Sequence, residues 1–335
     1  VEITIDAEEQ DRLTLSLNII EKLALDKVIK NWTGFGIALQ AYGKRSINVI
    51  HWINKILDKR EKMHLRLVKG AYWDYEIKHA QVFGYEDYPV YSKKSLTDIS
   101  FLLCAKEILK NEKIYAKFAT HNAHTISSVH QLGQGKDYEF QRLYGMGELL
   151  YQSAEKVLNL EKKPSVYAPI GSYKDLLPYL VRRLLENGAN SSFINRLLDP
   201  ETDANWLAEN PAIRIEKEKI DIPLPKNIFT ERKNSSGFDL SENSNLENLE
   251  KSISAHKKNK INAESIYVNR DEKEKVGQKV YSIANNEEIG TAIFDDPTNV
   301  KSALENFASE KWSKYSVQER SQILIKISND IEKDP

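Results

Sequence analysis

Two adjacent arginines on one predicted helix are the residues whose type and spacing first suggest a binding function. Arg182 and Arg183 lie in LLPYLVRRLLENGAN, a helical pattern with Ser172 as its expected N-cap and Gly188 at its expected end. The spacing places both arginines and Glu186 on or beside one helix face. Two guanidinium groups suit a carboxylate ligand, and a solvated basic patch paired to Glu186 is the alternative.

A second dense group of polar and aromatic residues is RLVKGAYWD, at positions 66–74. Arg66 and Lys69 stand at the end of an expected strand, and Gly70 lets a phosphate or a planar ring approach the backbone closely. An ordinary strand-to-helix turn is the alternative for Lys-Gly-Ala alone. The number of such residues in so short a stretch favours a binding site.

The histidines and the single cysteine suggest less. His121 and His124 are three apart in THNAH, but one is expected at a strand end and the other in the next helix, so we predict a hydrogen-bonding role for His121 and no metal. Cys104 lies in an apolar helical stripe with Leu103 and Ile108, which predicts a buried, inert thiol. No glycine-rich dinucleotide or phosphate loop of the usual patterns occurs.

Length, charge and hydropathy limit the class of protein. The 335 residues suggest one domain and part of another, and 48 basic against 49 acidic residues imply no nucleic acid partner. One cysteine fits a reducing compartment, so we expect a cytoplasmic protein. No run of about 18 uncharged apolar residues occurs, so no membrane span is predicted.

Short β-rich runs alternate with longer helical patterns in the first 200 residues. The six runs end in polar or aromatic residues, and the helical patterns include LTLSLNIIEKLALDKVIK and TDISFLLCAKEILK. This alternation predicts an α/β fold of the (βα)8 TIM-barrel type, with its site at the carboxyl ends of the strands. Since such a barrel needs eight strands, we expect two of them before Val1. The runs are VEITID, FGIALQAY, HLRLVKGAY, IYAKFATH, DYEFQRLYG and SVYAPIG.

The composition changes after about residue 200. We predict an N-terminally truncated barrel at 1–200, a linker rich in Pro, Ser, Asn and charge at 201–262, and the start of another α/β domain at 263–335. The strand and helix pattern of this last part ends at Pro335. We therefore expect a C-terminally truncated second domain.

The motifs together resemble a known family. IDAEEQDR, QAYGKR, RLVKGAYWDYEIKHAQ, FATHNAHT, YEFQRLYGMGE, YAPIG and YLVRRLLENGANSSFINR are similar to proline dehydrogenase, in the bifunctional bacterial form called proline utilization A. The resemblance covers roughly residues 1–200. Residues from about Asn234 onward are more loosely similar to that family's linker and to the first part of its aldehyde dehydrogenase domain.

The resemblance implies a flavoenzyme that oxidises L-proline to 1-pyrroline-5-carboxylate by hydride transfer to FAD. In that family Asp6 and Arg66 would be catalytic, with Arg66 beside the reactive flavin nitrogen. The proline pocket would be formed by Asp6, Tyr72, Leu143, Tyr167, Arg182 and Arg183. FAD would be held by Ala7, Gln40, Arg66, Lys69, Gly70, Ala71, Trp73, Ser92, Lys93, Lys94, Thr120, His121, Asn122, Gln141, Glu186, Ser192 and Phe193.

Three departures accompany the resemblance. The family often has Thr-Arg-Lys where this chain has Ser92, Lys93 and Lys94, so a bidentate arginine contact would be lost. A family lysine near the substrate carboxylate is expected upstream of Val1. The second activity, NAD-dependent oxidation of glutamate semialdehyde, needs a cysteine, and none follows Asn234. We therefore expect that catalytic part to be absent, and the fragment alone to be inactive.

Partners and rival functions remain open at this stage. The resemblance implies a membrane quinone as electron acceptor and peripheral contact with the inner membrane, although no amphipathic basic helix supports it. A homo-oligomer and an upstream DNA-binding segment are undecided. One alternative is a non-catalytic barrel fragment that serves as a scaffold or interaction piece through its exposed strand edges. Another, an aldolase-like barrel, would need a glycine-rich phosphate loop, which Tyr167-Ala-Pro-Ile-Gly is not.

Overall fold

The structure is a computed structural model of the 335-residue chain. It describes residues 1–188, 209–217, 222–256, 260–264, 277–306 and 310–333. The chain divides into two compact units, Val1–Leu246 and Glu247–Pro335.

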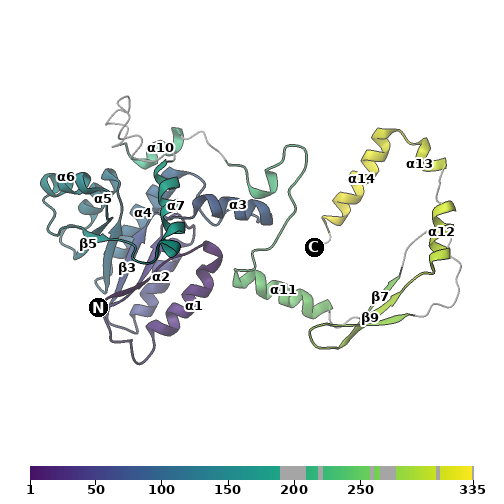
Figure 1. The fold of residues 1–335 in the computed structure, drawn as a ribbon, viewed down its shortest axis with the longest axis horizontal. Helices are drawn as coiled ribbons and strands as arrows, with labels where there is room; N and C mark the ends of the chain where they lie inside the picture. Colours follow the sequence, from purple (N-terminus) through teal and green to yellow (C-terminus); the bar gives the residue numbers. More distant parts are fainter. Residues whose placement is uncertain (189–208, 218–221, 257–259, 265–276, 307–309, 334–335) are drawn as a thin grey trace. The chain divides into compact units, whose positions relative to one another are not determined.

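The first unit is organised around one six-stranded sheet, whose strands follow each other in chain order (Figure 1). Every neighbouring pair is parallel. The six predicted strands and the alternating α/β class are therefore confirmed, and the sheet has the arrangement of part of a parallel barrel. The strands are β1 Ile3–Ile5, β2 Phe35–Gln40, β3 Met63–Val68, β4 Ile114–Ala119, β5 Tyr138–Leu143 and β6 Ser165–Tyr167.

Helices connect the strands, as parallel pairing requires. Helix α1 is shorter than its apolar pattern predicts, since Leu25 to Lys30 form turns. The Asp26 carboxylate accepts the backbone N–H of Val28 at 2.8 Å, a local bond that competes with helix continuation. The helical segments of this unit are η1 Gln10–Arg12, α1 Leu13–Ala24, α2 Ser46–Leu57, α3 Trp73–Phe83, α4 Lys94–Leu109, α5 Ala123–Leu132, α6 Glu148–Leu158, α7 Tyr173–Gly188, α10 Pro211–Lys217 and η2 Pro225–Asn227. Helix α11 (Asn243–His256) begins in this unit and continues into the second one.

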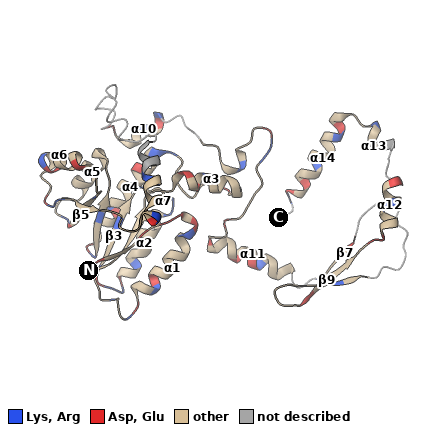
Figure 2. Ribbon diagram, viewed as in Figure 1, with Lys and Arg blue, Asp and Glu red and all other residues tan. Residues whose placement is uncertain are grey.

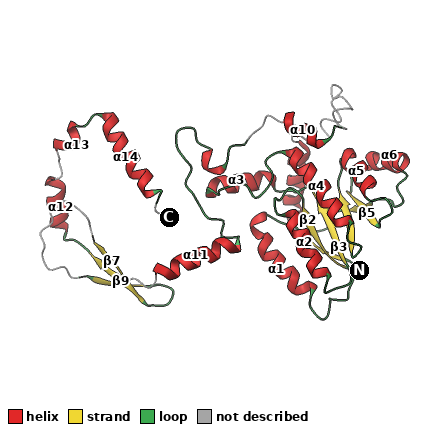
Figure 3. Cartoon of the chain, turned by 180° about the vertical axis from the view of Figure 1, so that it is seen from behind, coloured by secondary structure: helices red, strands yellow, loops and turns green. Residues whose placement is uncertain are grey.

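One face of the sheet carries the apolar core. Side chains alternate between the two faces of a strand, and in β3 the alternate residues Met63, Leu65 and Leu67 are at most 1% exposed. They pack with residues of α1, α2, α4 and α5, and Figure 3 shows α1, α2 and α4 along this side of the sheet. We call this side the helix-covered face. Its burial supplies the main stabilisation of the unit.

The opposite face is polar. His64 and Arg66 alternate with the apolar residues of β3, and Arg66 is in register with Lys117 of β4, which is in register with Glu139 of β5. We call this side the polar face and define it by His64, Arg66, Tyr115, Lys117, Glu139, Gln141 and Tyr167. The register therefore places charged residues from three strands side by side.

The second unit contains a small mixed sheet and helices. Strand β9 (Glu288–Ile293) lies between β7 (Ile261–Glu264), which is parallel to it, and β8 (Gln278–Tyr281), which is antiparallel. The sheet is followed by α12 (Pro297–Asn306), α13 (Glu310–Lys314) and α14 (Val317–Ile331). A capping box between Ser316 and Glu319 begins α14.

Charge and hydropathy of the helices agree with the sequence. Basic and acidic residues are interspersed along α11 and α14 rather than segregated by sign (Figure 2). Among the described residues, no helix combines the length and the apolar character that crossing a bilayer requires.

Candidate active site

Arg66 lies at the centre of a cluster near the carboxyl ends of the strands. Its Nε donates to the Oε1 atom of Gln141 at 2.9 Å, and its Nη1 lies 3.5 Å from a carboxylate oxygen of Asp6. The guanidinium carbon stands 4.8 Å from the centroid of the Tyr167 ring. One cluster is thus formed by residues of β3, β5 and β6 together with Asp6, which directly follows β1. The result is a cation held in a fixed orientation, with its side chain 19% exposed.

The turn after β3 is tied to the turn after β2. Gly70 has φ of 139°, and a Cβ there would come within 2.5 Å of the Tyr42 ring, so glycine is needed for this close approach. The Gln40 side chain accepts the backbone N–H of Ala71 at 3.1 Å and donates to the carbonyl of Glu8 at 2.7 Å. One side chain therefore connects three segments that carry predicted site residues.

Lys69, which follows β3, is held by a carboxylate. Its ammonium pairs with Asp98 of α4, and both side chains are largely buried. The next loop contributes Trp73, whose indole N–H donates to the carbonyl of Tyr91 at 2.9 Å. Position 93 is the N-cap of α4, so the Ser92, Lys93 and Lys94 segment lies at the beginning of that helix.

Helix α7 brings the paired arginines to the same end of the sheet. The Arg182 guanidinium carbon lies 4.8 Å from the centroid of the Tyr72 ring, and that of Arg183 lies 5.2 Å from the Tyr179 ring. The Tyr72 hydroxyl donates to Glu8 at 2.5 Å. Burial, and then the bond to Glu8, raise the pKa of Tyr72 to about 12, so its hydroxyl keeps its proton at neutral pH.

The helix begins where the sequence predicts. Tyr173 is its first residue, directly after Ser172, and the backbone N–H of Asp175 lies 3.4 Å from the Ser172 hydroxyl. Gly188, the predicted stop, is its last residue. The side chain of Glu186 and both Ser192 and Phe193 lie outside what the structure describes.

His121 is a buried hydrogen-bond acceptor. Its Nε2 accepts the backbone N–H of Leu143 at 3.1 Å, so the proton of the neutral ring is on Nδ1. Burial, and then the nearby Arg183 and Arg142, lower the pKa of His121 to about 4. This agrees with the predicted hydrogen-bonding role. Among the described residues no group of metal-ligand type converges.

Thr120, Asn122 and Ala7, three other predicted FAD contacts, make hydrogen bonds within the fold. Thr120 is 5% exposed, and its carbonyl accepts the hydroxyl of Tyr151 at 2.9 Å. The Asn122 side chain accepts the backbone N–H of Thr125 at 2.9 Å and caps α5, in which His124 lies. Ala7 lies beside Asp6, whose carboxylate accepts its N–H at 3.0 Å.

The predicted inert thiol is confirmed. Cys104 is 0% exposed, and burial raises the pKa of its thiol to about 11. Ile108 is buried as well, whereas Leu103 is 51% exposed. The buried apolar stripe of α4 is therefore narrower than its sequence suggests.

Sequence reasoning missed several carboxylates around these residues. Glu8 accepts from Tyr72 and binds Gln40 through its carbonyl, and Asp98 pairs with Lys69. Glu76, which is 2% exposed, accepts the backbone N–H of Gln10 at 2.8 Å. The alternation of polar residues along β4 and β5 could have revealed Lys117 and Glu139, since a covered parallel strand usually carries apolar residues on both faces.

The fold and the site together define a class of protein. A parallel α/β domain holds a fixed arginine, polar side chains and a paired arginine helix at one end of its strands, an arrangement suited to a planar, anionic ligand and a carboxylate. The sequence profile of the family described as Proline dehydrogenase matches residues 1–196. The chain belongs to the proline dehydrogenase family, a family of flavin oxidoreductases.

Individual relatives agree with this placement. The chain is 45% identical over 271 residues to the bifunctional protein PutA of Klebsiella aerogenes, covering 75% of this chain and 21% of that protein. It is 39% identical over 344 residues to PutA of Salmonella typhimurium, covering 96% of this chain and 26% of that protein. A crystal structure of proline utilization A from Bdellovibrio bacteriovorus, inactivated by N-propargylglycine, superposes with a TM-score of 0.81 at 25% identity, covering 100% of this chain and 35% of that one. The chain thus spans about a fifth of the length of the Klebsiella aerogenes protein.

Proposed function

We propose that the protein containing this chain oxidises L-proline to 1-pyrroline-5-carboxylate with FAD as the hydride acceptor. One observation carries the proposal: Arg66 is fixed between Asp6, Gln141 and Tyr167 at the end of the sheet to which α7 brings its two arginines. The family match supports the same activity.

The donor set fits a flavin nucleotide. Gly70 removes the Cβ that would crowd the turn after β3, and Gln40 and Lys69 place an amide and an ammonium group at that turn. Gln141 adds an amide beside Arg66. Bound there, FAD would supply two-electron acceptance. Arg66 would place a fixed positive charge beside the electron-rich reduced ring, which stabilises that state. Ala71, Trp73, His121 and the residues 92–94 are further proposed contacts.

The two α7 arginines would bind the substrate carboxylate. Arg182 and Arg183 are adjacent on one helix, and charge-assisted contacts of this kind fix both position and orientation. Tyr72, whose ring lies under Arg182, and Tyr167, whose ring lies under Arg66, would flank the proline ring with Leu143. Because Tyr72 retains its proton and donates it to Glu8, it would act as a neutral wall of the pocket rather than as a base.

The rest of the chain extends this proposal. We infer that residues 201–262 form the linker and 263–335 the beginning of an aldehyde dehydrogenase domain, since the Salmonella relative matches 96% of this chain. The parent protein would then pass the product to an NAD-dependent semialdehyde dehydrogenase. A membrane quinone would reoxidise the flavin.

The test is optical and uses the full-length parent protein. Addition of L-proline without oxygen should bleach the absorption band of the bound flavin, whereas D-proline, as the matched control, should leave it unchanged. A protein that purifies with no flavin, or whose flavin band persists with L-proline, would contradict the proposal.

A further inference from the structure

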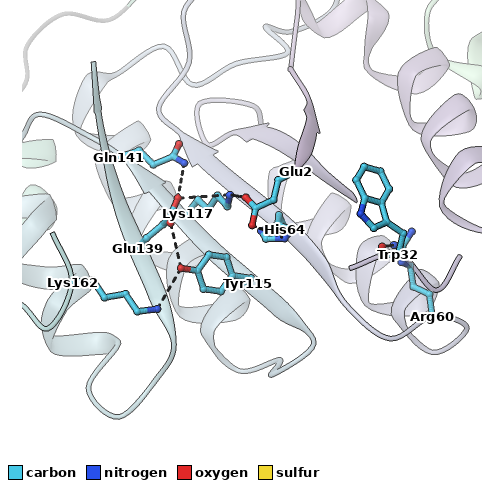
Figure 4. Close-up of polar contacts among 9 residues, drawn as sticks. All are labelled: Glu2, Trp32, Arg60, His64, Tyr115, Lys117, Glu139, Gln141 and Lys162. Atoms are coloured by element: carbon cyan, nitrogen blue, oxygen red, sulfur yellow. Dashed lines mark hydrogen bonds and ion pairs between the residues drawn. The ribbon is translucent and has the colours of Figure 1, made fainter. Parts of the chain in front are cut away.

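The side-chain amide of Gln141 connects Arg66 to a second polar cluster on the polar face. Its Oε1 accepts from Arg66 Nε at 2.9 Å. Its Nε2 donates to Glu139 Oε1 at 2.8 Å, a bond that Figure 4 shows. A primary amide has one acceptor end and one donor end. A reversed Gln141 would point N–H groups at the Arg66 donor and its oxygen at the Glu139 carboxylate. The negative charge of Glu139 therefore selects the orientation in which Gln141 accepts from Arg66.

The Glu139 carboxylate is itself held from two sides. Lys117 Nζ lies 3.7 Å from its Oε1, and the Tyr115 hydroxyl donates to its Oε2 at 3.3 Å. The side chains of Lys117 and Glu139 are only 8% and 16% exposed. Lys117 also pairs with Glu2, and Lys162 donates to the Tyr115 hydroxyl at 3.4 Å. These contacts hold Glu139 in place, because Gln141 donates to one of its oxygens and Tyr115 to the other.

We propose that Glu139 is a positioning residue that acts through Gln141 on Arg66. Anchoring Nε of Arg66 fixes the plane of its guanidinium and directs the remaining nitrogens toward Asp6 and the Tyr167 ring. The inference deepens the proposed function and rests on it, since the orientation of Arg66 matters there for the flavin. Glu139 is not among the residues proposed to contact FAD or proline, and it would act through Gln141, which is.

The structure also gives a reason for the charged row in the middle of a parallel sheet. Arg66, Lys117 and Glu139 occupy facing positions on three adjacent strands, with Lys117 between the other two, so Glu139 adds a negative charge to a row that holds two cations. Without Glu139, the amide N–H of Gln141 would lose its acceptor, and the Gln141 oxygen would no longer be held toward Nε of Arg66. The carboxylate thus sets both charge balance and geometry.

The test is a double-mutant cycle in the full-length parent protein. Glu139→Ala, Gln141→Leu and the double variant are compared by flavin content, by the midpoint potential of the bound flavin in anaerobic dye titrations, and by kcat and KM for proline. Glu139→Ala should lower kcat about ten-fold and make the potential more negative, with flavin content unchanged. The double variant should match Gln141→Leu alone, because both changes cut the same chain of contacts. Glu139→Gln keeps an acceptor oxygen but loses the negative charge, so it should recover only part of the potential.

Glu112→Gln is the matched control. Glu112 stands shortly before β4 and pairs with Lys136 at the surface, outside the Glu139 network, so its loss should change neither potential nor kcat. Losses that add in the double variant, or an unchanged potential in Glu139→Ala, would overturn the proposal. If the wild-type flavin does not react with proline, the proposed function fails while the potentials still decide this inference. If no flavin binds, the same cycle is measured on urea unfolding, where a coupling of zero between positions 139 and 141 would overturn it.

Discussion

Neighbouring residues of β4 show how differently the two faces of the sheet are stabilised. Phe118 is 0% exposed on the helix-covered face, where it contacts Phe101, Tyr138 and Phe140 edge to face or tilted. Lys117, one residue earlier, is 6% exposed on the polar face among carboxylates. The two residues are buried to nearly the same extent. Phe118 needs only apolar neighbours, whereas the ammonium group of Lys117 needs neighbours of opposite charge. The comparison indicates that the chemical nature of the contacting residues, rather than the degree of burial, distinguishes the apolar core from the polar face.

The largest effect is expected from breaking the helix-covered face. Phe118→Ala should lower the free energy of unfolding by about 3–5 kcal/mol, because it leaves a cavity among buried aromatic rings. Tyr115→Phe on the polar face of the same strand removes only a hydroxyl group and its hydrogen bonding to Glu139. This change should lower the free energy of unfolding by about 1 kcal/mol. Urea unfolding measures both. Equal losses would mean that the two faces do not differ in this way.

A buried acid should make stability fall as pH rises. Glu76 accepts from the Tyr42 hydroxyl at 3.4 Å as well as from Gln10, and burial is the main cause that raises its pKa to about 7. The folded state therefore disfavours the ionised form. The contribution of protonated Glu76 to the free energy of unfolding is fully present below the ordinary pKa of 4.5 and is lost as pH rises to about 7. Above that pH its effect no longer changes. The cost at pH 8 is about 3 kcal/mol.

Glu76→Gln should remove this part of the pH dependence and be more stable than wild type at pH 8 by up to about 3 kcal/mol. Urea midpoints at pH 5 and pH 8 test it. His121 provides an internal control with the opposite sign: its pKa of about 4 lies below the ordinary 6.5, so it costs stability as pH falls from about 6.5 toward 4. That acid-side loss should persist in the variant. An unaltered loss between pH 5 and 8 would contradict the role of Glu76.

The smallest expected effect concerns ligand affinity. Arg183→Met should raise KM for proline about 10- to 100-fold, the effect of one charge-assisted contact, with flavin content unchanged. Lys174→Met, an exposed change on the same helix, is the control and should have no effect. Steady-state kinetics and flavin absorbance give both quantities. If the variant lost flavin binding and proline binding to the same extent, the proposal that Arg183 contacts proline and not the flavin would be wrong.

Particular residues show what the sequence by itself determined. The six β-rich runs fixed the strands, since alternation and length are local properties, and the Ser172 cap fixed the beginning of α7. The polar residue at each strand end located the site, because parallel strands bring their carboxyl ends together. The buried Cys104 followed from its apolar neighbours. The assignment of individual ligand contacts remains a prediction.

Only the tertiary structure decided the partners of those residues. Glu139 meets Lys117 because β4 and β5 pair in one register, and a shift of a single residue would have turned its side chain to the opposite face. Glu76 is buried against Gln10, 66 positions away, which no local pattern records. Sequence periodicity shows which face a side chain occupies. Charge, protonation and orientation depend on the atoms opposite, and these are brought there by strands and turns distant in the chain.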